Sequence, residues 1–327
     1  MKFLATLFLL VLIAAATLGY LFLLPYGPST ETFVDIAPGT SSTSIGLQLA
    51  KSGIIRSQYA FDLFRGYKSG TLKAGEYRFD HAAPLSEVYA RLLKGDVYTR
   101  AVTIPEGFNI FDVAQAIENA GLGTKEDFLA AERQDTELIS TLSPHATSLE
   151  GYLFPDTYKF SRHATPEQML ATMVKRFRLA AAQLGLNTGI SQTVTMASVV
   201  EKEVSQDDER PLVAGVFTNR LAQNTPLATD PTVIYAALLE NRYRGTIYAS
   251  DLQSQSPYNT YRHTGLPPGP ICNPGVAALR AAISPAKTGY LYFVSDANGH
   301  SRFATTLKQH TENVQKYRHA EHAAGLR

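Results

Sequence analysis

Two glutamates close an apolar segment of the chain, Met196–Glu203, which reads MASVVEKE. A helix turns by about 100° per residue, so it would place Glu203 beside Val199 and Glu201 beside Ala197. Both carboxylates then border apolar faces. Burial penalises the charged form of a carboxyl group, and a carboxyl that keeps its proton near neutral pH can act as a general acid.

The same helical wheel offers a less specific alternative. Ser198, Lys202 and Ser205 fall on one polar stripe between the two glutamates. If that stripe faces solvent, Glu201 and Glu203 are ordinary surface charges at its borders. The wheel alone does not choose between these interpretations, nor between the two glutamates.

Polar residues also gather among aromatic ones in the segment Leu149–Phe160, LEGYLFPDTYKF. The composition predicts a turn or short strand around the proline, with its polar groups directed forward. Glu150, Tyr152 and Asp156 are therefore candidate substrate-binding residues.

Two further helices should present polar side chains at their ends. An apolar pattern with periods of three and four residues ends at Asn219 and Arg220. Next, Thr229 or Asp230 would cap a helix that has Pro231 in its first turn, where the missing N–H does no harm. These four polar residues join the candidate site.

The segment Ser256–Gly275 is rich in proline and glycine and has little apolar periodicity, which predicts neither helix nor central strand. Loops of this length are usually functional or disordered. The chain has no tryptophan, so Tyr258 and Tyr261 could supply a flat surface for a sugar, while Asn259 and Thr260 suit hydroxyl and amide recognition. The alternative is a rigid structural loop.

Composition excludes several classes of function. The 327 residues are 45% hydrophobic and 18% charged, which predicts a globular protein of about two domains. A formal net charge of +1 provides no basic field for nucleic acid. Cys272 is the only cysteine, so no intrachain disulfide forms. The histidines lack the H-E-x-x-H spacing of a zinc site, and we expect no metal and no cofactor.

The N-terminus predicts a membrane anchor. The segment Phe3–Leu24 is uncharged, and a helix of about 20 apolar residues crosses a bilayer. A cleaved signal peptide is the alternative, although its apolar region is typically about 7 to 15 residues long. Lys2 precedes the segment and the first charges after it are Glu31 and Asp35, so the positive-inside rule predicts a cytoplasmic N-terminus and an extracytoplasmic chain.

A repeat follows the anchor. Asp35–Ile54 and Thr103–Leu122 match at a constant offset, and each predicts a short strand, a glycine turn and an amphipathic helix ended by glycine. Such units on cell-surface proteins often bind a polymer, and the alternative is a spacer with its own core. With a strand at Ala74–Phe79, a helix at Val276–Ile283 and a hairpin at Tyr290–Phe303, the pattern predicts an α+β fold.

Six long motifs occur in one order behind the anchor: EGYLFPDTY, MASVVEKE, VFTNRL, ATDPTVIYA, YNTYRHTGLPPGPICNPG and YLYFV. In these motifs the chain closely resembles, over essentially its whole length, the MltG/YceG-like family of membrane-bound endolytic murein transglycosylases. The resemblance implies that the second glutamate of the EKE motif, Glu203, is catalytic.

Taken with these patterns, the resemblance implies four segments. Residues 1–25 are a cytoplasmic tip and transmembrane anchor, 26–98 a linker and LysM-like subdomain, 99–144 a second small strand–helix unit, and 145–327 the catalytic domain. The protein would sit in the cytoplasmic (inner) membrane with its catalytic domain in the periplasm. Peptidoglycan glycan strands are the implied substrate, and cell-wall synthases are implied partners.

The implied reaction is non-hydrolytic cleavage of the bond between N-acetylmuramic acid and N-acetylglucosamine, which leaves 1,6-anhydro ends and terminates or trims nascent strands. One carboxyl, Glu203, would serve as acid and then as base. Two alternatives stay open. A hydrolytic muramidase would use Glu201 or Asp230 as a second carboxylate, and a non-catalytic glycan-binding anchor would recruit synthases.

Overall fold

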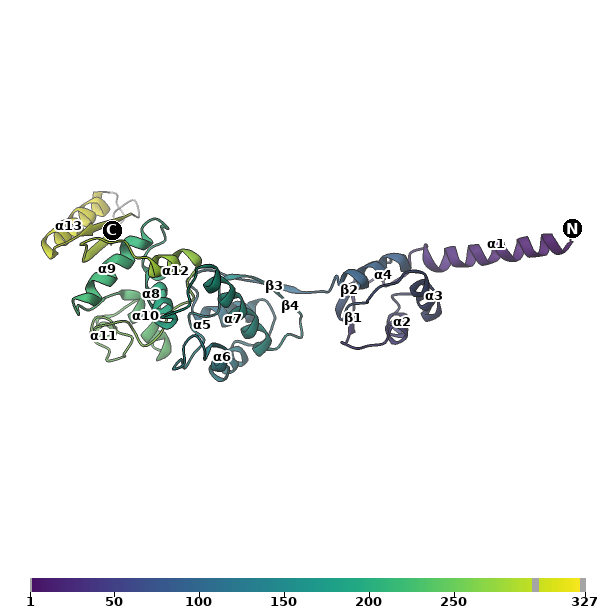
Figure 1. Ribbon diagram of the computed structural model, residues 1–327, viewed down its shortest axis with the longest axis horizontal. Helices are drawn as coiled ribbons and strands as arrows, with labels where there is room; N and C mark the ends of the chain where they lie inside the picture. The colour runs from purple at the N-terminus through teal and green to yellow at the C-terminus, as the bar shows by residue number, and fades with distance from the viewer. Residues whose placement is uncertain (1, 296–299, 324–327) are drawn as a thin grey trace. The chain divides into compact units, whose positions relative to one another are not determined.

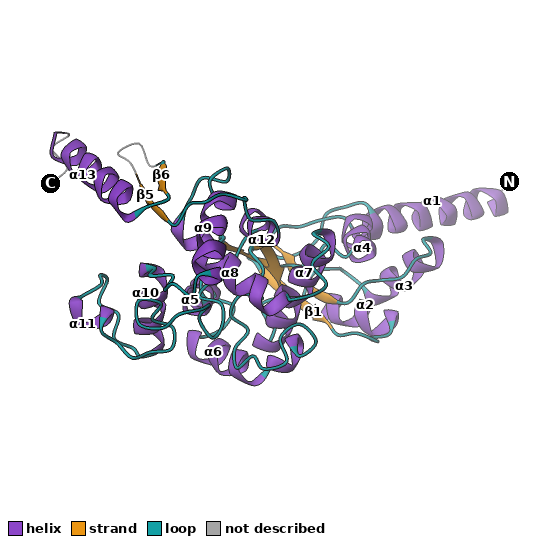
Figure 2. Cartoon of the chain, turned by 60° about the vertical axis from the view of Figure 1, so that its left-hand side comes forward, coloured by secondary structure: helices purple, strands orange, loops and turns teal. Residues whose placement is uncertain are grey.

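The computed structural model describes residues 2–295 and 300–323. The chain folds into two compact units, Met1–Arg100 with Lys159–His163 and Ala101–Tyr158 with Ala164–Arg327. Helices dominate, and the described strands form three two-stranded sheets (Figure 2). This mixture of helix and sheet confirms the predicted α+β class.

The first unit consists of one long helix, an antiparallel strand pair and three short helices (Figure 1): α1 (Lys2–Phe22), β1 (Thr32–Ile36), α2 (Ser42–Lys51), α3 (Gln58–Tyr67), β2 (Gly75–Phe79) and α4 (Leu85–Lys94). Val34 of β1 lies opposite Tyr77 of β2. The unit has its own apolar core, in which Leu49, Phe61 and Leu92 are fully buried. The strand predicted at Ala74–Phe79 is confirmed as β2.

Helix α1 corresponds to the predicted anchor. None of its 21 residues is buried, and its mean hydropathy is 2.3. A helix rises about 1.5 Å per residue, so α1 is about 30 Å long, which is the thickness of the hydrocarbon layer of a bilayer. Among the described residues it is the one helix with the length and composition to cross a membrane.

The rest of the chain forms two strand pairs, β3 with β4 and β5 with β6, a 3₁₀ turn at Thr136–Ile139 and nine helices among the described residues. These elements are β3 (Arg100–Ile104), α5 (Ile110–Asn119), α6 (Lys125–Gln134), β4 (Asp156–Phe160), α7 (Pro166–Gln183), α8 (Ile190–Glu203), α9 (Arg210–Ala222), α10 (Asp230–Leu239), α11 (Ala249–Leu252), α12 (Val276–Ile283), β5 (Tyr292–Ser295), β6 (Ser301–Ala304) and α13 (Leu307–Ala323). The predicted helix α12 and the predicted hairpin are confirmed, although the predicted hairpin tip, Asn298-Gly299, lies outside the described residues.

The predicted repeat has the expected local structure in both copies. A strand is followed by a glycine in the left-handed region, Gly39 at φ 82° and Gly107 at φ 79°, and then by a helix. Gly53 and Gly121 follow the helix ends at φ 69° and 65°. Glycine adopts these angles without the steric cost that a Cβ atom would add. The first copy lies in the first unit and the second copy in the second unit.

Helix α8, which carries both glutamates of the EKE motif, packs against α9, α10 and α12. Ser198 is fully buried, and its hydroxyl accepts a hydrogen bond from the backbone N–H of Ile271 at 3.0 Å. The Sγ atom of Cys272 donates to the Ser198 carbonyl. A solvent-facing polar stripe through Ser198 is therefore wrong, because the proline- and glycine-rich loop covers this part of the helix.

Gly215 allows α9 to approach the segment after α12, and this contact gives a test of the packing. A Cβ atom at Gly215 would lie 2.4 Å from the carbonyl oxygen of Ala286. Replacing glycine by alanine inside a helix usually stabilises by about 1 kcal/mol, but we expect Gly215→Ala to lower the melting temperature in thermal unfolding followed by circular dichroism. The matched change Gly66→Ala in α3, where nothing lies within 4 Å, should not lower it. Equal effects of both changes would contradict the packing.

Candidate functional site

Glu201 is a paired, buried carboxylate. Its Oε1 atom accepts a hydrogen bond from Arg210 at 2.7 Å, and both side chains are nearly inaccessible to solvent. Its Oε2 atom accepts the backbone N–H of Gly275 at 2.9 Å, at the start of α12. Glu201 therefore ties α8 to α9 and α12, and this role is structural.

Glu203 lies two residues further, at the end of α8, on the wall of a cavity of about 700 Å³. Its side chain is partly exposed to this cavity. Apolar residues of the same helix, Val199 and Val200, are fully buried beneath it. Two hydrogen-bond donors hold the Glu201 carboxylate, whereas no described residue donates a hydrogen bond to the Glu203 carboxyl. Its charged neighbours are Asp230 and Arg220. It is free to exchange a proton with a molecule in the cavity.

The surroundings of Glu203 favour its protonated form. Burial is the largest cause, the negative charge of Asp230 adds to it, and the positive charge of Arg220 opposes it; together they raise the pKa of Glu203 to about 7. A carboxyl with this pKa holds a proton in a substantial fraction of molecules at neutral pH. This is the property that a general acid and base needs.

A second buried carboxyl, Glu150, has a raised pKa but a different setting. Burial raises its pKa to about 8, and the side chain is 2% exposed. Its two oxygens accept hydrogen bonds from the backbone N–H of Ile110 at 2.9 Å and from Asn273 at 3.2 Å. Glu150 does not line the cavity around Glu203. Glu150 therefore connects the loop Ser256–Gly275, helix α5 and the segment before β4 inside the protein.

Four other candidate residues do line the cavity with Glu203: Arg220, Thr229, Asp230 and Tyr261. The Tyr261 hydroxyl donates to Asp230 at 2.7 Å. Arg220 donates to the carbonyls of Leu291 at 2.6 Å and Leu227 at 2.7 Å, so it holds two walls of the cavity together. The structure thus brings part of the predicted site together.

The remaining candidates lie outside the cavity lining. Tyr152 is 1% exposed and packs edge-on against Phe177. Asp156 forms a partly exposed ion pair with Arg176 at 2.6 Å. The Asn219 amide donates to two carbonyls of the segment before β5, at 2.8 and 2.9 Å. Each of these side chains contacts another part of the protein and does not face the cavity.

The loop residues divide in the same way. The Asn259 side chain is fully buried, donates to the carbonyls of Leu252 and Ser254, and accepts the N–H of Tyr261. Thr260 is 1% exposed and accepts the backbone N–H of Thr229. Tyr258 packs on Tyr235, with ring centroids 5.1 Å apart. Only Tyr261 of the four extends to the cavity, so most of the loop is the rigid frame of that wall.

The cavity has a wall that the sequence interpretation missed. Tyr292 and Phe293 of β5 line it, as do His310, Val314 and Arg318 of α13. The Tyr292 and His310 rings stack with centroids 5.3 Å apart. The signal was present in the sequence, because these α13 residues recur at spacings of four and lie on one helix face.

The fold and site define a class of protein: an α+β protein whose cavity is lined by a glutamate of raised pKa, a second carboxylate, an arginine and aromatic rings. Comparison with known families narrows the class. Residues 34–316 match the family described as "YceG-like family", and the chain belongs to that family.

Named relatives and a solved structure are similar over most of the chain. A Bacillus subtilis protein named "Endolytic murein transglycosylase" is 34% identical, over 88% of this chain and 85% of its own length. A Streptococcus pneumoniae R6 protein of the same name is 31% identical over 95% of this chain, which spans only 64% of that relative's length. A 2.6 Å crystal structure of a yceG-like protein from Listeria monocytogenes superposes with a TM-score of 0.59 at 30% identity, over 87% of this chain and 99% of that one.

The electrostatic origin of the Glu203 pKa can be tested at Asp230. Asp230→Asn removes a neighbouring negative charge, so the pKa of Glu203 should fall below about 7 but stay above 4.5, because burial still raises it. The measurement is an NMR titration with carboxyl-labelled glutamate, in which Glu203→Gln identifies the signal.

Tyr261→Phe is the matched control. It removes the hydroxyl that contacts Asp230 and leaves both charged neighbours of Glu203 in place. It should shift the Glu203 pKa less than Asp230→Asn does. An unchanged Glu203 pKa in the Asp230→Asn protein would contradict the assigned cause.

Proposed function

We propose that this protein is an endolytic murein transglycosylase, an enzyme that cleaves peptidoglycan glycan strands. Membership of the YceG-like family and the names of the relatives support this function. The single observation that carries the mechanism is Glu203, a carboxyl with a pKa of about 7 on the wall of a 700 Å³ cavity.

In the proposed mechanism Glu203 acts twice. The protonated carboxyl donates its proton to the oxygen that leaves C1 of N-acetylmuramic acid, and the bond between C1 and that oxygen breaks. The C6 hydroxyl of the same sugar then attacks C1 and gives its proton to the Glu203 carboxylate. The proton returns to Glu203, no water is consumed, and the new end is a 1,6-anhydro sugar. This product would terminate or trim nascent strands.

The other charged residues of the cavity support this cycle. Asp230 raises the Glu203 pKa, which favours the acid form, and its carboxylate is held by Tyr261. Arg220 favours the carboxylate that forms after proton transfer. The ring of Tyr261, 40% exposed, offers a surface on which a sugar can stack. A muramidase would instead use Asp230 as the second carboxylate.

Glu203→Gln tests the mechanism. The amide keeps the shape but has no titratable proton, and loss of general acid catalysis costs about 10² to 10⁴ in rate. Digestion of isolated sacculi followed by mass spectrometry measures both the rate and the product. Wild-type protein should release ends in 1,6-anhydro-N-acetylmuramic acid, one water lighter than hydrolysed ends. Hydrolysed reducing ends would identify a muramidase, and an active Glu203→Gln protein would exclude Glu203 as the acid.

Stability measurements separate lost chemistry from lost folding. Folding raises the Glu203 pKa from 4.5 to about 7, so the charged form costs the folded state up to about 3 kcal/mol above pH 7 and nothing below pH 4.5. Glu203→Gln should therefore be at least as stable as wild type above pH 7. Glu201→Gln should unfold more easily, since removing one partner of a buried pair costs about 3 to 5 kcal/mol, but its folded molecules should lose much less turnover than Glu203→Gln.

We propose that α1 remains as a single membrane anchor, with a cytoplasmic N-terminus and the rest of the chain in the periplasm, where its substrate lies. The hydropathy of α1 and the charge asymmetry around it support this topology. We also propose that residues 26–98 are a LysM-like subdomain. A further proposal is that the protein binds cell-wall synthases. The separate core of the first unit supports an independent subdomain.

Protease treatment of spheroplasts tests the topology. All other helices and strands follow α1 in the chain, so added protease should degrade nearly the whole protein, while a cytoplasmic marker protein stays intact. Protection of residues 101–327 in intact spheroplasts, with degradation after detergent, would contradict the proposed orientation.

A further inference from the structure

Helix α3 has an apolar stripe that the fold of the first unit does not cover. Tyr59, Leu63 and Tyr67 are spaced by four residues and lie along one face, and they are 82%, 58% and 82% exposed. Phe61, on the opposite face of the helix, is fully buried in the core of the unit. Aromatic and aliphatic side chains exposed in a row usually mark a binding surface.

This stripe is continuous with the apolar surface of α1. A groove of about 500 Å³ runs between the two helices, and residues from both line it: Ala15, Leu18, Gly19, Phe22, Leu23, Leu63, Phe64 and Tyr67. The rings of Phe22 and Phe64 pack edge-on, with centroids 5.4 Å apart. Figure 1 shows α3 beside the C-terminal end of α1. The end of α3 is therefore level with the last two turns of α1.

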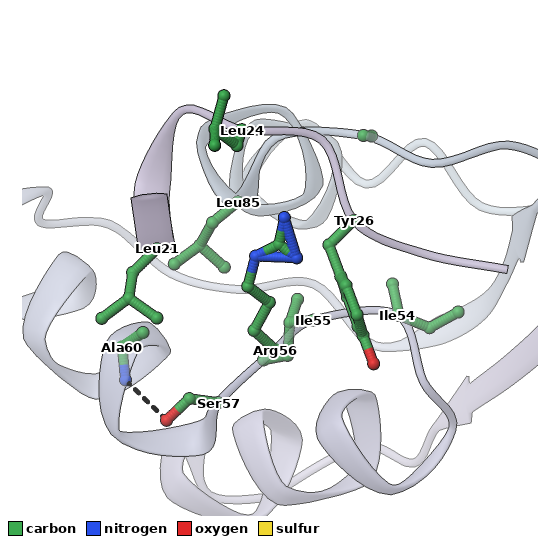
Figure 3. Close-up of a pocket in the computed structure, with 10 residues that line it drawn as sticks. Leu21, Leu24, Tyr26, Ile54, Ile55, Arg56, Ser57, Ala60 and Leu85 are labelled. Atoms are coloured by element: carbon green, nitrogen blue, oxygen red, sulfur yellow. Dashed lines mark hydrogen bonds between the residues drawn. The ribbon is translucent and has the colours of Figure 1, made fainter. Parts of the chain in front are cut away.

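The junction between α1 and the unit is held by Arg56. Its guanidinium donates to the carbonyls of Tyr20 and Pro25 and lies over the rings of Tyr20 and Tyr26, at 4.4 and 4.7 Å from their centroids. Figure 3 shows Arg56 between Leu21 of α1 and Tyr26, directly before Ser57, whose hydroxyl caps α3. Because Arg56 directly precedes Ser57, the N-cap of α3, the same residue fixes α3 against α1.

These contacts determine how deep the end of α3 lies in a bilayer that α1 spans. The apolar part of α1, Phe3–Phe22, is about 30 Å of helix, which matches the roughly 30 Å of a hydrocarbon layer. Ala15, which lines the groove, lies about 10 Å along the helix before its last residue, Phe22. When α1 spans a bilayer, Leu63 and Tyr67 therefore reach the layer where acyl chains meet headgroups. Tyrosine is enriched at that boundary, and the exposed Arg65 and Lys68 can extend toward phosphates.

We infer that α3 is an interfacial helix, whose Tyr59–Leu63–Tyr67 stripe lies in the surface of the phospholipid bilayer that α1 spans. The stripe and the anchor then form one membrane-binding surface, and they fix the height and tilt of the first unit at the membrane. This surface is separate from the chemistry of Glu203, so turnover measurements do not test it.

The absence of tryptophan from the chain makes a site-specific test possible. The full chain is reconstituted in phosphatidylcholine–phosphatidylglycerol vesicles as a single-tryptophan variant, Tyr67→Trp or Tyr59→Trp. Both positions are highly exposed, so the fold should accept the change. The control, Asp35→Trp, is at an exposed position of β1, which Figure 1 shows at the end of the unit opposite α1.

The expected result is a blue-shifted emission for Tyr67→Trp, strong quenching by lipids with brominated acyl chains and protection from aqueous iodide. Asp35→Trp should show the reverse pattern. Equal iodide quenching of the two variants in vesicles would overturn the inference, because the stripe would then face water. Protection from both quenchers would also overturn it, since a second copy or another protein would then cover the stripe.

Discussion

The ion pair between Glu201 and Arg210 is the interaction on which the candidate site depends. It lies where α8 ends, α9 begins and the N-terminus of α12 arrives, and it joins all three through the Gly275 N–H. A Cβ atom at position 275 would lie 1.9 Å from the Glu106 carboxyl, so the exposed Glu106 side chain would have to move to admit one. The negative charge of Glu201 is thus satisfied twice, by a guanidinium and by a helix N-terminus.

The fixed position of Glu201 determines what Glu203 can do. Two residues along a helix correspond to a turn of about 200°, so a helix that buries Glu201 against α9 and α12 directs Glu203 to its opposite side. There the second glutamate meets the cavity and receives no donor from the described residues. One carboxylate of the motif therefore stabilises the fold, while the other is kept at a cost in stability and available for proton transfer.

Local patterns predicted much of this arrangement. Glycine spacing predicted both strand–turn–helix repeats, and Pro231 after Thr229 predicted the start of α10. The helical wheel also placed both glutamates beside apolar neighbours, but it could not supply Arg210, because that partner comes from the next helix. For the same reason the burial of Ser198 was missed: a loop more than 70 residues later in the chain covers it.

The type of a residue did not predict whether its side chain lines the cavity, because that depends on its position in the fold. Asn259 and Thr260 have the hydrogen-bonding groups of a sugar site, yet those groups are used to hold the loop against α10 and α11. Tyr261, the next residue, is the one that reaches the cavity, and its backbone N–H donates a hydrogen bond to the side-chain oxygen Oδ1 of Asn259. The loop is therefore a rigid frame that reaches the cavity at one of these residues, Tyr261.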